Sequence, residues 1–157
     1  MYRVEEILFF MMQNRWMLFQ IFFLLYLIIL SCMDIRRRKL SLRVLLAGAP
    51  AAVISGIFAS EIPAVLLIAG GAVGLGFLAV SRVSGEALGY GDSILITILG
   101  IFLGFWNILS VLMAAFLLAA VFSAVMLARR GFTRKSSSPF VPFLAAAYIG
   151  AVLTGGF

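Results

Sequence analysis

Six apolar runs, separated by short polar segments, constrain the fold of this chain more than any other feature. They cover residues 16–33, 40–58, 62–80, 92–105, 107–127 and 140–157. Runs of about 18 apolar residues or more are typical of membrane helices. A soluble domain with 64% hydrophobic residues and a mean hydropathy of +1.20 would expose too much apolar surface. We therefore predict an all-α integral membrane protein. It is one membrane-embedded domain over residues 1–157 with about six transmembrane helices, and residues 1–15 form an interfacial lead-in.

The basic residues predict how these helices are oriented. With six spans, one side of the membrane would carry ten of the twelve Lys and Arg residues, and the other side only Arg3 and Arg15. Lys and Arg accumulate in cytoplasmic loops, so the crowded side is predicted to be cytoplasmic and both termini external. The net charge of +6 therefore reflects topology, and nucleic acid binding is not expected. The ten residues are Arg36, Arg37, Arg38, Lys39, Arg43, Arg82, Arg129, Arg130, Arg134 and Lys135.

Two of the six acidic residues lie at the same predicted depth of the membrane. Asp34 ends the first apolar run and Asp92 begins the fourth, both on the cytoplasmic side. Each residue alone has an ordinary explanation, since Asp92 could cap a helix and Asp34 could pair with nearby arginines. Acids within membrane segments are costly, so two at one depth indicate a function. We expect helix packing to bring them together.

The residue types present limit the chemistry of such a site. The chain has no histidine and a single cysteine, Cys32, which we expect to be a small buried residue. These counts exclude histidine-based catalysis, a disulfide within the chain and a paired-cysteine zinc site, and we expect neither metal nor cofactor. Two adjacent carboxylates can instead share a proton, one activating a water and the other donating to the substrate. That pattern predicts peptide hydrolysis without a covalent intermediate.

Three ordered motifs carry a family resemblance. The string "EALGYGDSILITILG" contains G-x-G-D, "DIRRRKLS" begins with Asp34, and "KSSSPFVPFLAAAYIG" contains P-F-x-P-F-L-A. Together they resemble the catalytic segments of bacterial type IV prepilin peptidases, which are G-x-G-D intramembrane aspartyl proteases. The resemblance implies catalytic roles for Asp34 and Asp92. It implies site-shaping roles for Gly89, Tyr90, Gly91, Arg38, Lys135, Pro139, Phe140 and Pro142.

The resemblance also has departures. Family members usually carry proline where Ser41 stands and often lysine where Ile94 stands, which affects the expected contacts with substrate or lipid. The cytoplasmic segment with paired cysteines that long members carry is missing. We therefore expect the short, peptidase-only form, without a zinc site and without N-methylation of the product. The glycines of "GYGD" are expected to allow close approach of a substrate strand and unusual backbone dihedrals.

The substrate follows from the resemblance as an expectation. Prepilin- and pseudopilin-like precursors carry a basic cytoplasmic leader before an apolar helix, and the family cuts at that junction. The enzyme would act at the cytoplasmic face of the bacterial inner membrane. Glu86 is a candidate contact for the leader, although a solvated loop acid is its ordinary explanation. The basic loops are expected to contact anionic lipid headgroups.

Other functions remain open at this point. A small proton- or cation-coupled transporter or channel subunit could use Asp34 and Asp92, although its acids would more often lie mid-span. A non-catalytic assembly factor of a pilus or secretion system is a further alternative. A hydrolase built on Ser41 and Lys39 is disfavoured because sequence neighbours rarely point together. Finally, "GGAVG" from Gly70 and "GIFLG" from Gly100 predict close helix packing through small residues.

Overall fold

The computed structural model describes residues 14–37, 42–58, 61–83, 89–130 and 139–156, and all regular structure in these segments is helical. A helix occupies each of the six predicted apolar runs, as expected where a segment in lipid must pair its own backbone groups. The helices are α2 (Arg15–Arg37), α3 (Leu42–Phe58), α4 (Ala64–Val83), α5 (Tyr90–Leu103), α6 (Phe105–Arg130) and α7 (Val141–Leu153). The predicted lead-in over residues 1–13 lies outside the described residues.

Length divides these helices into two groups. The segments Arg15–Arg36, Ala64–Val83 and Phe105–Arg129 are long and apolar enough to cross a membrane. The other helices, α3, α5 and α7, have 17, 14 and 13 residues. The all-helical, apolar character of the prediction is confirmed, and three candidate spans are found within the described residues. Six crossings and external termini stay predictions.

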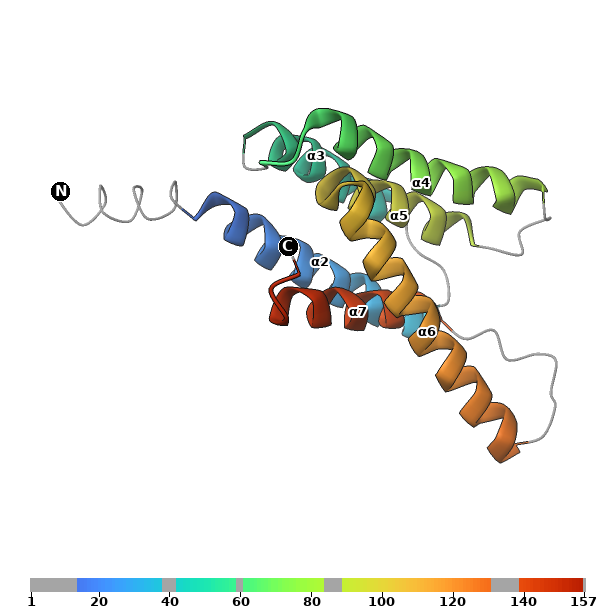
Figure 1. Cartoon of the computed structure of the whole chain (residues 1–157). Helices are drawn as coiled ribbons and strands as arrows, with labels where there is room; N and C mark the ends of the chain where they lie inside the picture. The colour runs from blue at the N-terminus through green and yellow to red at the C-terminus, as the bar shows by residue number, and fades with distance from the viewer. Residues whose placement is uncertain (1–13, 38–41, 59–60, 84–88, 131–138, 157) are drawn as a thin grey trace.

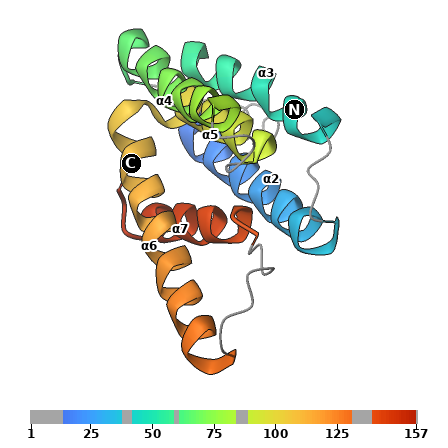
Figure 2. The same ribbon diagram turned by 90° about the vertical axis from the view of Figure 1, so that its right-hand side faces the viewer.

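The helices form two neighbouring groups. Helices α3, α4 and α5 lie together in one group, and α7 lies beside α2 in the other, as two perpendicular views agree (Figures 1 and 2). Helix α6 begins next to α5 and runs past α7. Contacts between α3 and α5 and between α2 and α3 join the two groups. The two aspartates of interest therefore lie in different groups, Asp34 on α2 and Asp92 on α5.

Helices α4 and α5 cross at a seam of glycines, as the small-residue motifs predicted. A methyl group on Gly70 would overlap the carbonyl oxygen of Gly100, and one on Gly74 would overlap the backbone of Thr97. No residue other than glycine fits at Gly70 or Gly74 with the helices at this spacing. Small residues permit such backbone contact in membrane helices, where van der Waals packing drives association.

Ring stacking joins α2 to the far end of α5. Phe102 of α5 lies between two rings of α2, with centroids 4.1 Å from Phe23 and 4.9 Å from Trp16. These contacts make α2 and α5 neighbours, and the two helices run in opposite directions (Figure 1). The end of α2 therefore lies at the same end of the molecule as the beginning of α5. The Tyr26 hydroxyl donates to the Leu45 carbonyl at 2.6 Å and ties α3 to the same face of α2.

Helix α7 also runs antiparallel to α2. The Tyr148 hydroxyl donates to the Gln20 carbonyl at 3.2 Å near the start of α2, and the first residue of α7 contacts the end of α2. Gly104 makes the turn from α5 into α6 with φ of +77°, a left-handed conformation that glycine adopts without steric cost. Cys32 on α2 is exposed, so the expectation that it is buried is wrong: it lies on the face of α2 that α5 and α7 do not cover.

Candidate active site

Asp34 lies in the last turn of α2, where that helix meets α7. Only 9% of the residue is exposed, which makes it the one buried charged residue among those described. The backbone N–H of Val141, the first residue of α7, donates to Asp34 Oδ2 at 3.4 Å. A buried carboxylate needs such partners because desolvation is otherwise costly. The end of α2 and the start of α7 thus enclose one carboxylate.

The P-F-x-P-F segment builds this part of the site. Phe140 precedes α7 and contacts Phe116 of α6, with ring centroids 5.2 Å apart. Phe143 contacts Phe122, nearly two turns further along α6, at 5.3 Å. Pro142 lies in the first turn of α7, where the missing N–H of proline has no helical partner to lose. The two phenylalanines therefore fix α7 on α6, and the backbone N–H of Val141, one of the two residues between them, faces Asp34.

Asp92 lies in the first turn of α5, which begins at Tyr90. The helix thus starts two residues before the apolar run that was predicted over residues 92–105. A negative side chain is favourable at this position because the helix dipole is positive there. A methyl group on Gly89 would lie 3.2 Å from Asp92 Oδ2, so the carboxylate folds back over the residue that precedes the helix.

Among the glycines of "GYGD", Gly89 lies close to the Asp92 carboxylate, and the dihedral part of the expectation is wrong. Close approach of a substrate strand stays a prediction. Gly89 has φ −59° and ψ 131°, a conformation open to any residue, and Gly91 is helical. Positive φ occurs among the described glycines at Gly104 and Gly155. Glycine at position 89 leaves space for the Asp92 carboxylate.

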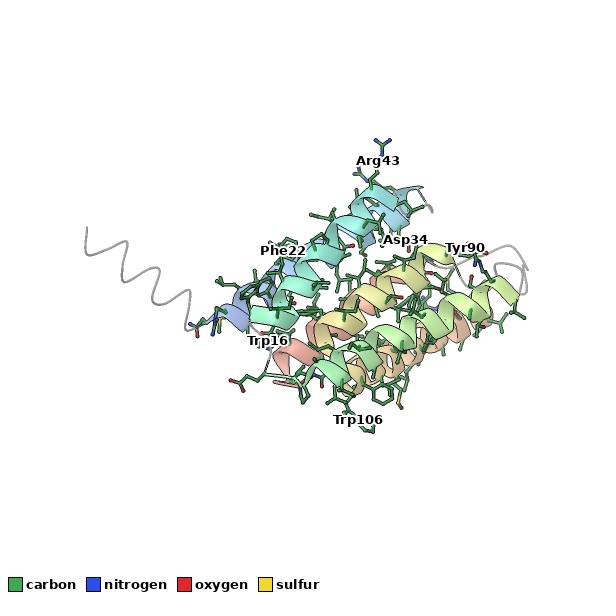
Figure 3. The ribbon with its side chains drawn as sticks, turned by 90° about the horizontal axis from the view of Figure 1, so that it is seen from above. Trp16, Phe22, Asp34, Arg43, Tyr90 and Trp106 are labelled. Atoms are coloured by element: carbon green, nitrogen blue, oxygen red, sulfur yellow. The ribbon has the colours of Figure 1, made fainter. Side chains whose placement is uncertain are left out.

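The carboxylates of Asp34 and Asp92 are close enough for their charges to repel each other. The residues lie 58 positions apart in the sequence and come from α2 and α5, whose antiparallel packing places them at one end of the bundle (Figure 3, where Asp34 and Tyr90 are labelled). Two interacting carboxylates favour a state with a single shared negative charge. Such a pair can provide a base and an acid at once.

Hydroxyl groups stiffen the first two turns of α5 behind Asp92. Ser93 Oγ donates to the Gly89 carbonyl at 3.3 Å, and Thr97 Oγ1 donates to the Ser93 carbonyl at 2.9 Å. Ser93 is buried, and Thr97 packs on Gly74 of α4. The position of Asp92 is thus linked to the crossing of α4 and α5.

The other predicted site residues divide into two sets. Tyr90 is 38% exposed at the start of α5, and Pro139, Phe140 and Pro142 lead into α7 beside Asp34. Ile94, at a departure from the family pattern, packs against the core. Among the described residues, no group of three or more His, Cys, Asp or Glu could hold a metal ion. Four residues named from the sequence, Arg38, Ser41, Glu86 and Lys135, lie outside the described residues.

Comparison with known proteins gives one match. The model of the type IV leader peptidase family matches residues 21–124, about two thirds of the chain and a range that contains both aspartates. The chain belongs to the type IV leader peptidase family. No curated protein and no solved structure matches it.

Membership of the type IV leader peptidase family carries several properties. The family consists of membrane-embedded peptidases that act on prepilin-like substrates, so this chain is a peptidase of that general kind. The apolar helices agree with insertion in a membrane. The match ends within α6 and does not include the P-F-x-P-F segment. The contact between Val141 and Asp34 is what places that segment at the site.

Sequence reasoning missed Val141. The P-F-x-P-F motif drew attention to its prolines and to Phe140, while the contact to Asp34 comes from the residue between Phe140 and Pro142. The only signal in the sequence was Pro142. Because proline has no N–H, the N–H of Val141 is the only one that the first two residues of α7 can donate. A backbone group has no residue type, and therefore no motif identifies it.

Proposed function

We propose that this chain is an aspartic endopeptidase that removes the basic leader from type IV prepilin- or pseudopilin-like precursors. Asp34 and Asp92 would be its catalytic residues, acting without metal or cofactor. The single observation that carries the proposal is the interaction of these two carboxylates at one end of the bundle, within a chain of the type IV leader peptidase family.

The chemistry follows from a pair that shares one proton. The ionised carboxylate takes a proton from a water molecule, whose oxygen attacks the carbonyl carbon of the scissile peptide. The protonated carboxylate donates to the carbonyl oxygen, giving a tetrahedral intermediate. Transfer of a proton to the amide nitrogen then breaks the C–N bond. The products are a leader with a new carboxyl end and a mature protein with a new amino end.

The location of the pair suits a junction between a basic segment and an apolar helix. Six crossings with both termini external would put the ends of α2, α4 and α6 and the starts of α3, α5 and α7 on the cytoplasmic side. The described basic residues Arg36, Arg43, Arg82 and Arg129 belong to those ends. The active site would then lie at the cytoplasmic face of a bacterial inner membrane, where a prepilin leader is found.

The surroundings of the pair supply two further roles. Arg43 on α3 is exposed and points away from the helices (Figure 3), as expected for contact with anionic lipid headgroups. Glu86, just before the G-x-G-D motif, remains a candidate contact for the basic leader. Nucleic acid is not expected to bind, since the positive charge follows the topology.

Cleavage in cells tests this function. A pilin-like precursor from the same genome is expressed with the wild-type chain, Asp34→Asn or Asp92→Asn, and loss of the leader is followed on a gel. Glu61→Gln is the matched control because Glu61 is an exposed acid next to the start of α4, at the opposite end from the pair. Membrane levels of all four chains are measured by immunoblot.

We expect the wild-type chain and Glu61→Gln to cut the precursor and both aspartate variants to leave it intact at equal abundance. Cleavage by either aspartate variant would show that its aspartate is a helix cap or charge partner. If the wild-type chain cuts no precursor, the proposal fails and a transporter or assembly role takes its place.

A further inference from the structure

The two carboxylates of the pair have different hydrogen-bond environments. Val141 N–H donates to Asp34, whereas within the described residues no N–H or O–H group donates to Asp92. Both residues lie at the positive end of a helix, α7 for Asp34 and α5 for Asp92, but Asp34 also lies in the last turn of α2, at the negative end of that helix, so helix dipoles do not favour ionisation of Asp34 over Asp92. A directly donated hydrogen bond does, because it favours the charged form of the carboxylate that accepts it.

The first turn of α7 is arranged so that a single N–H points to Asp34. The Phe143 and Leu144 N–H groups both donate to the Phe140 carbonyl, at 3.0 and 3.2 Å. Position 142 is proline and has no N–H. Of the first four N–H positions of α7, only Val141 is left to donate outside the helix, and its partner is Asp34.

The placement of Val141 is fixed on both sides. Its side chain is fully buried. The neighbouring rings, Phe140 and Phe143, contact Phe116 and Phe122 of α6. The N–H of Val141 therefore cannot turn away from Asp34 unless α7 leaves α6.

We propose that the Val141 backbone N–H is a positioning group that keeps Asp34 as the ionised, water-activating member of the pair, and leaves Asp92 as the member that donates a proton to the substrate. This inference rests on the proposed function. The inference assigns the two carboxylates different roles. It also gives the P-F-x-P-F segment a role, which is to orient the Val141 N–H toward Asp34.

Replacing the amide by an ester removes this donor and little else. The chain is made by cell-free synthesis into phospholipid vesicles, with the α-hydroxy analogue of valine at position 141. The matched control carries the α-hydroxy analogue of leucine at position 144. Both esters weaken hydrogen bonding at the Phe140 carbonyl, but only the ester at 141 removes a donor to Asp34. Val141→Ala keeps the N–H and tests the side chain alone.

The initial rate of cleavage of a pilin-like precursor is measured against pH, over a range of precursor concentrations and per inserted chain. Besides Asp92, the ionisable groups on the helices packed against α2 are few. Helix α7 has only Tyr148, which bonds to Gln20 far from Asp34, and Arg43 of α3 points outward. Helix α5 also carries Tyr90, and α2 itself carries Tyr26, the exposed Cys32 and the exposed Arg36; the two tyrosines and the cysteine ordinarily titrate well above the acidic limb. A change in the acidic limb of the rate profile thus reports on the pair.

We expect the ester at 141 to lower the rate about tenfold at neutral pH, the low end for a hydrogen bond to a charged group because 3.4 Å is long. The acidic limb should move up by about one pH unit, since without its donor Asp34 loses its charge at higher pH. The precursor concentration that gives half the maximal rate should stay unchanged. The ester at 144 and Val141→Ala should behave as the wild-type chain.

Equal profiles for the two esters, or a wild-type profile for the ester at 141, would overturn the inference while leaving cleavage by the pair intact. A wild-type chain that cuts no precursor would instead remove the proposed function, and this inference with it. The two failures are therefore distinguishable in one experiment.

Discussion

A single methyl group at the crossing of α4 and α5 should disturb both the stability of the bundle and the position of Asp92. In Gly70→Ala the new methyl group would overlap the Gly100 carbonyl oxygen and contact Gly104. These are backbone atoms, so no side-chain rotation can relieve the contact. The helices must separate by roughly 1 Å to restore ordinary contacts of about 3.5–4 Å.

The expected magnitude can be worked from a matched change on the same helix. Gly76 also lies in α4, and a methyl group there meets nothing within 4 Å. Both alanines bring the same gain in helix propensity, so the difference between the two variants isolates the overlap. Overpacking of this kind costs about 1–3 kcal/mol. Gly70→Ala should therefore be less stable than Gly76→Ala by that amount.

The assay is reversible unfolding in mixed micelles with increasing denaturing detergent, followed by helix content and by cleavage of a pilin-like precursor after reconstitution. Because Thr97 and Ser93 connect the crossing to Asp92, a shift of about 1 Å in α5 should lower the cleavage rate up to roughly 100-fold. Gly76→Ala should keep the wild-type rate. Equal stability and equal rates for the two alanine variants would refute the glycine-seam argument.

Two further predictions concern the neighbourhood of the pair. Gly89→Ala would place a methyl group 3.2 Å from Asp92 Oδ2, in a backbone conformation that alanine accepts. The cleavage rate should therefore fall about tenfold, with little change in the free energy of unfolding. A rate equal to that of the wild-type chain would contradict the reason given for glycine at this position. Tyr26→Phe removes the hydrogen bond to the Leu45 carbonyl and should lower the free energy of unfolding by about 1 kcal/mol while the cleavage rate stays the same, since Tyr26 lies two turns of α2 before Asp34. Unchanged stability of Tyr26→Phe would show that this hydrogen bond does not hold α3 on α2, which would leave the contact of the Tyr26 ring with Gly48.

Hydropathy predicted the helices well because each apolar run must pair its own backbone groups in lipid. The run predicted from Asp92 is instructive, because the helix does not begin at the aspartate. The structure starts α5 at Tyr90, two residues earlier, because Gly89 provides its carbonyl to Ser93. Charged residues mark the ends of apolar runs only approximately, since an acid is favourable within the first turn of a helix.

The two aspartates could be predicted as a pair, but their surroundings could not. Depth in the membrane follows from the order of the runs, and this was enough to bring Asp34 and Asp92 to one end. The contact between Val141 and Asp34 depends on how α7 crosses α2, and the crossing of two helices cannot be inferred from the residue types at the contact. The exposure of Cys32 and the backbone dihedrals of Gly89 also depend on how the helices pack, so the sequence did not predict them.

The glycine seam is an intermediate case. The two small-residue motifs predicted that α4 and α5 make close contacts, and the structure pairs them with each other. The sequence could not identify the partner, because any two glycine-lined helices could approach as closely. The chain places the two motifs on consecutive helices, and the packing of α4 on α5 brings the glycines into register.

The account depends most on the claim that Asp34 and Asp92 act as one unit. The direct test is the single-turnover cleavage rate of the purified chain in phospholipid vesicles for Asp34→Asn, Asp92→Asn and the double variant, with Glu61→Gln as control. Groups that act together in one step are non-additive. We predict the same residual rate for all three aspartate variants and the wild-type rate for Glu61→Gln. Losses that multiply in the double variant, or a single variant that keeps the wild-type rate, would contradict the claim.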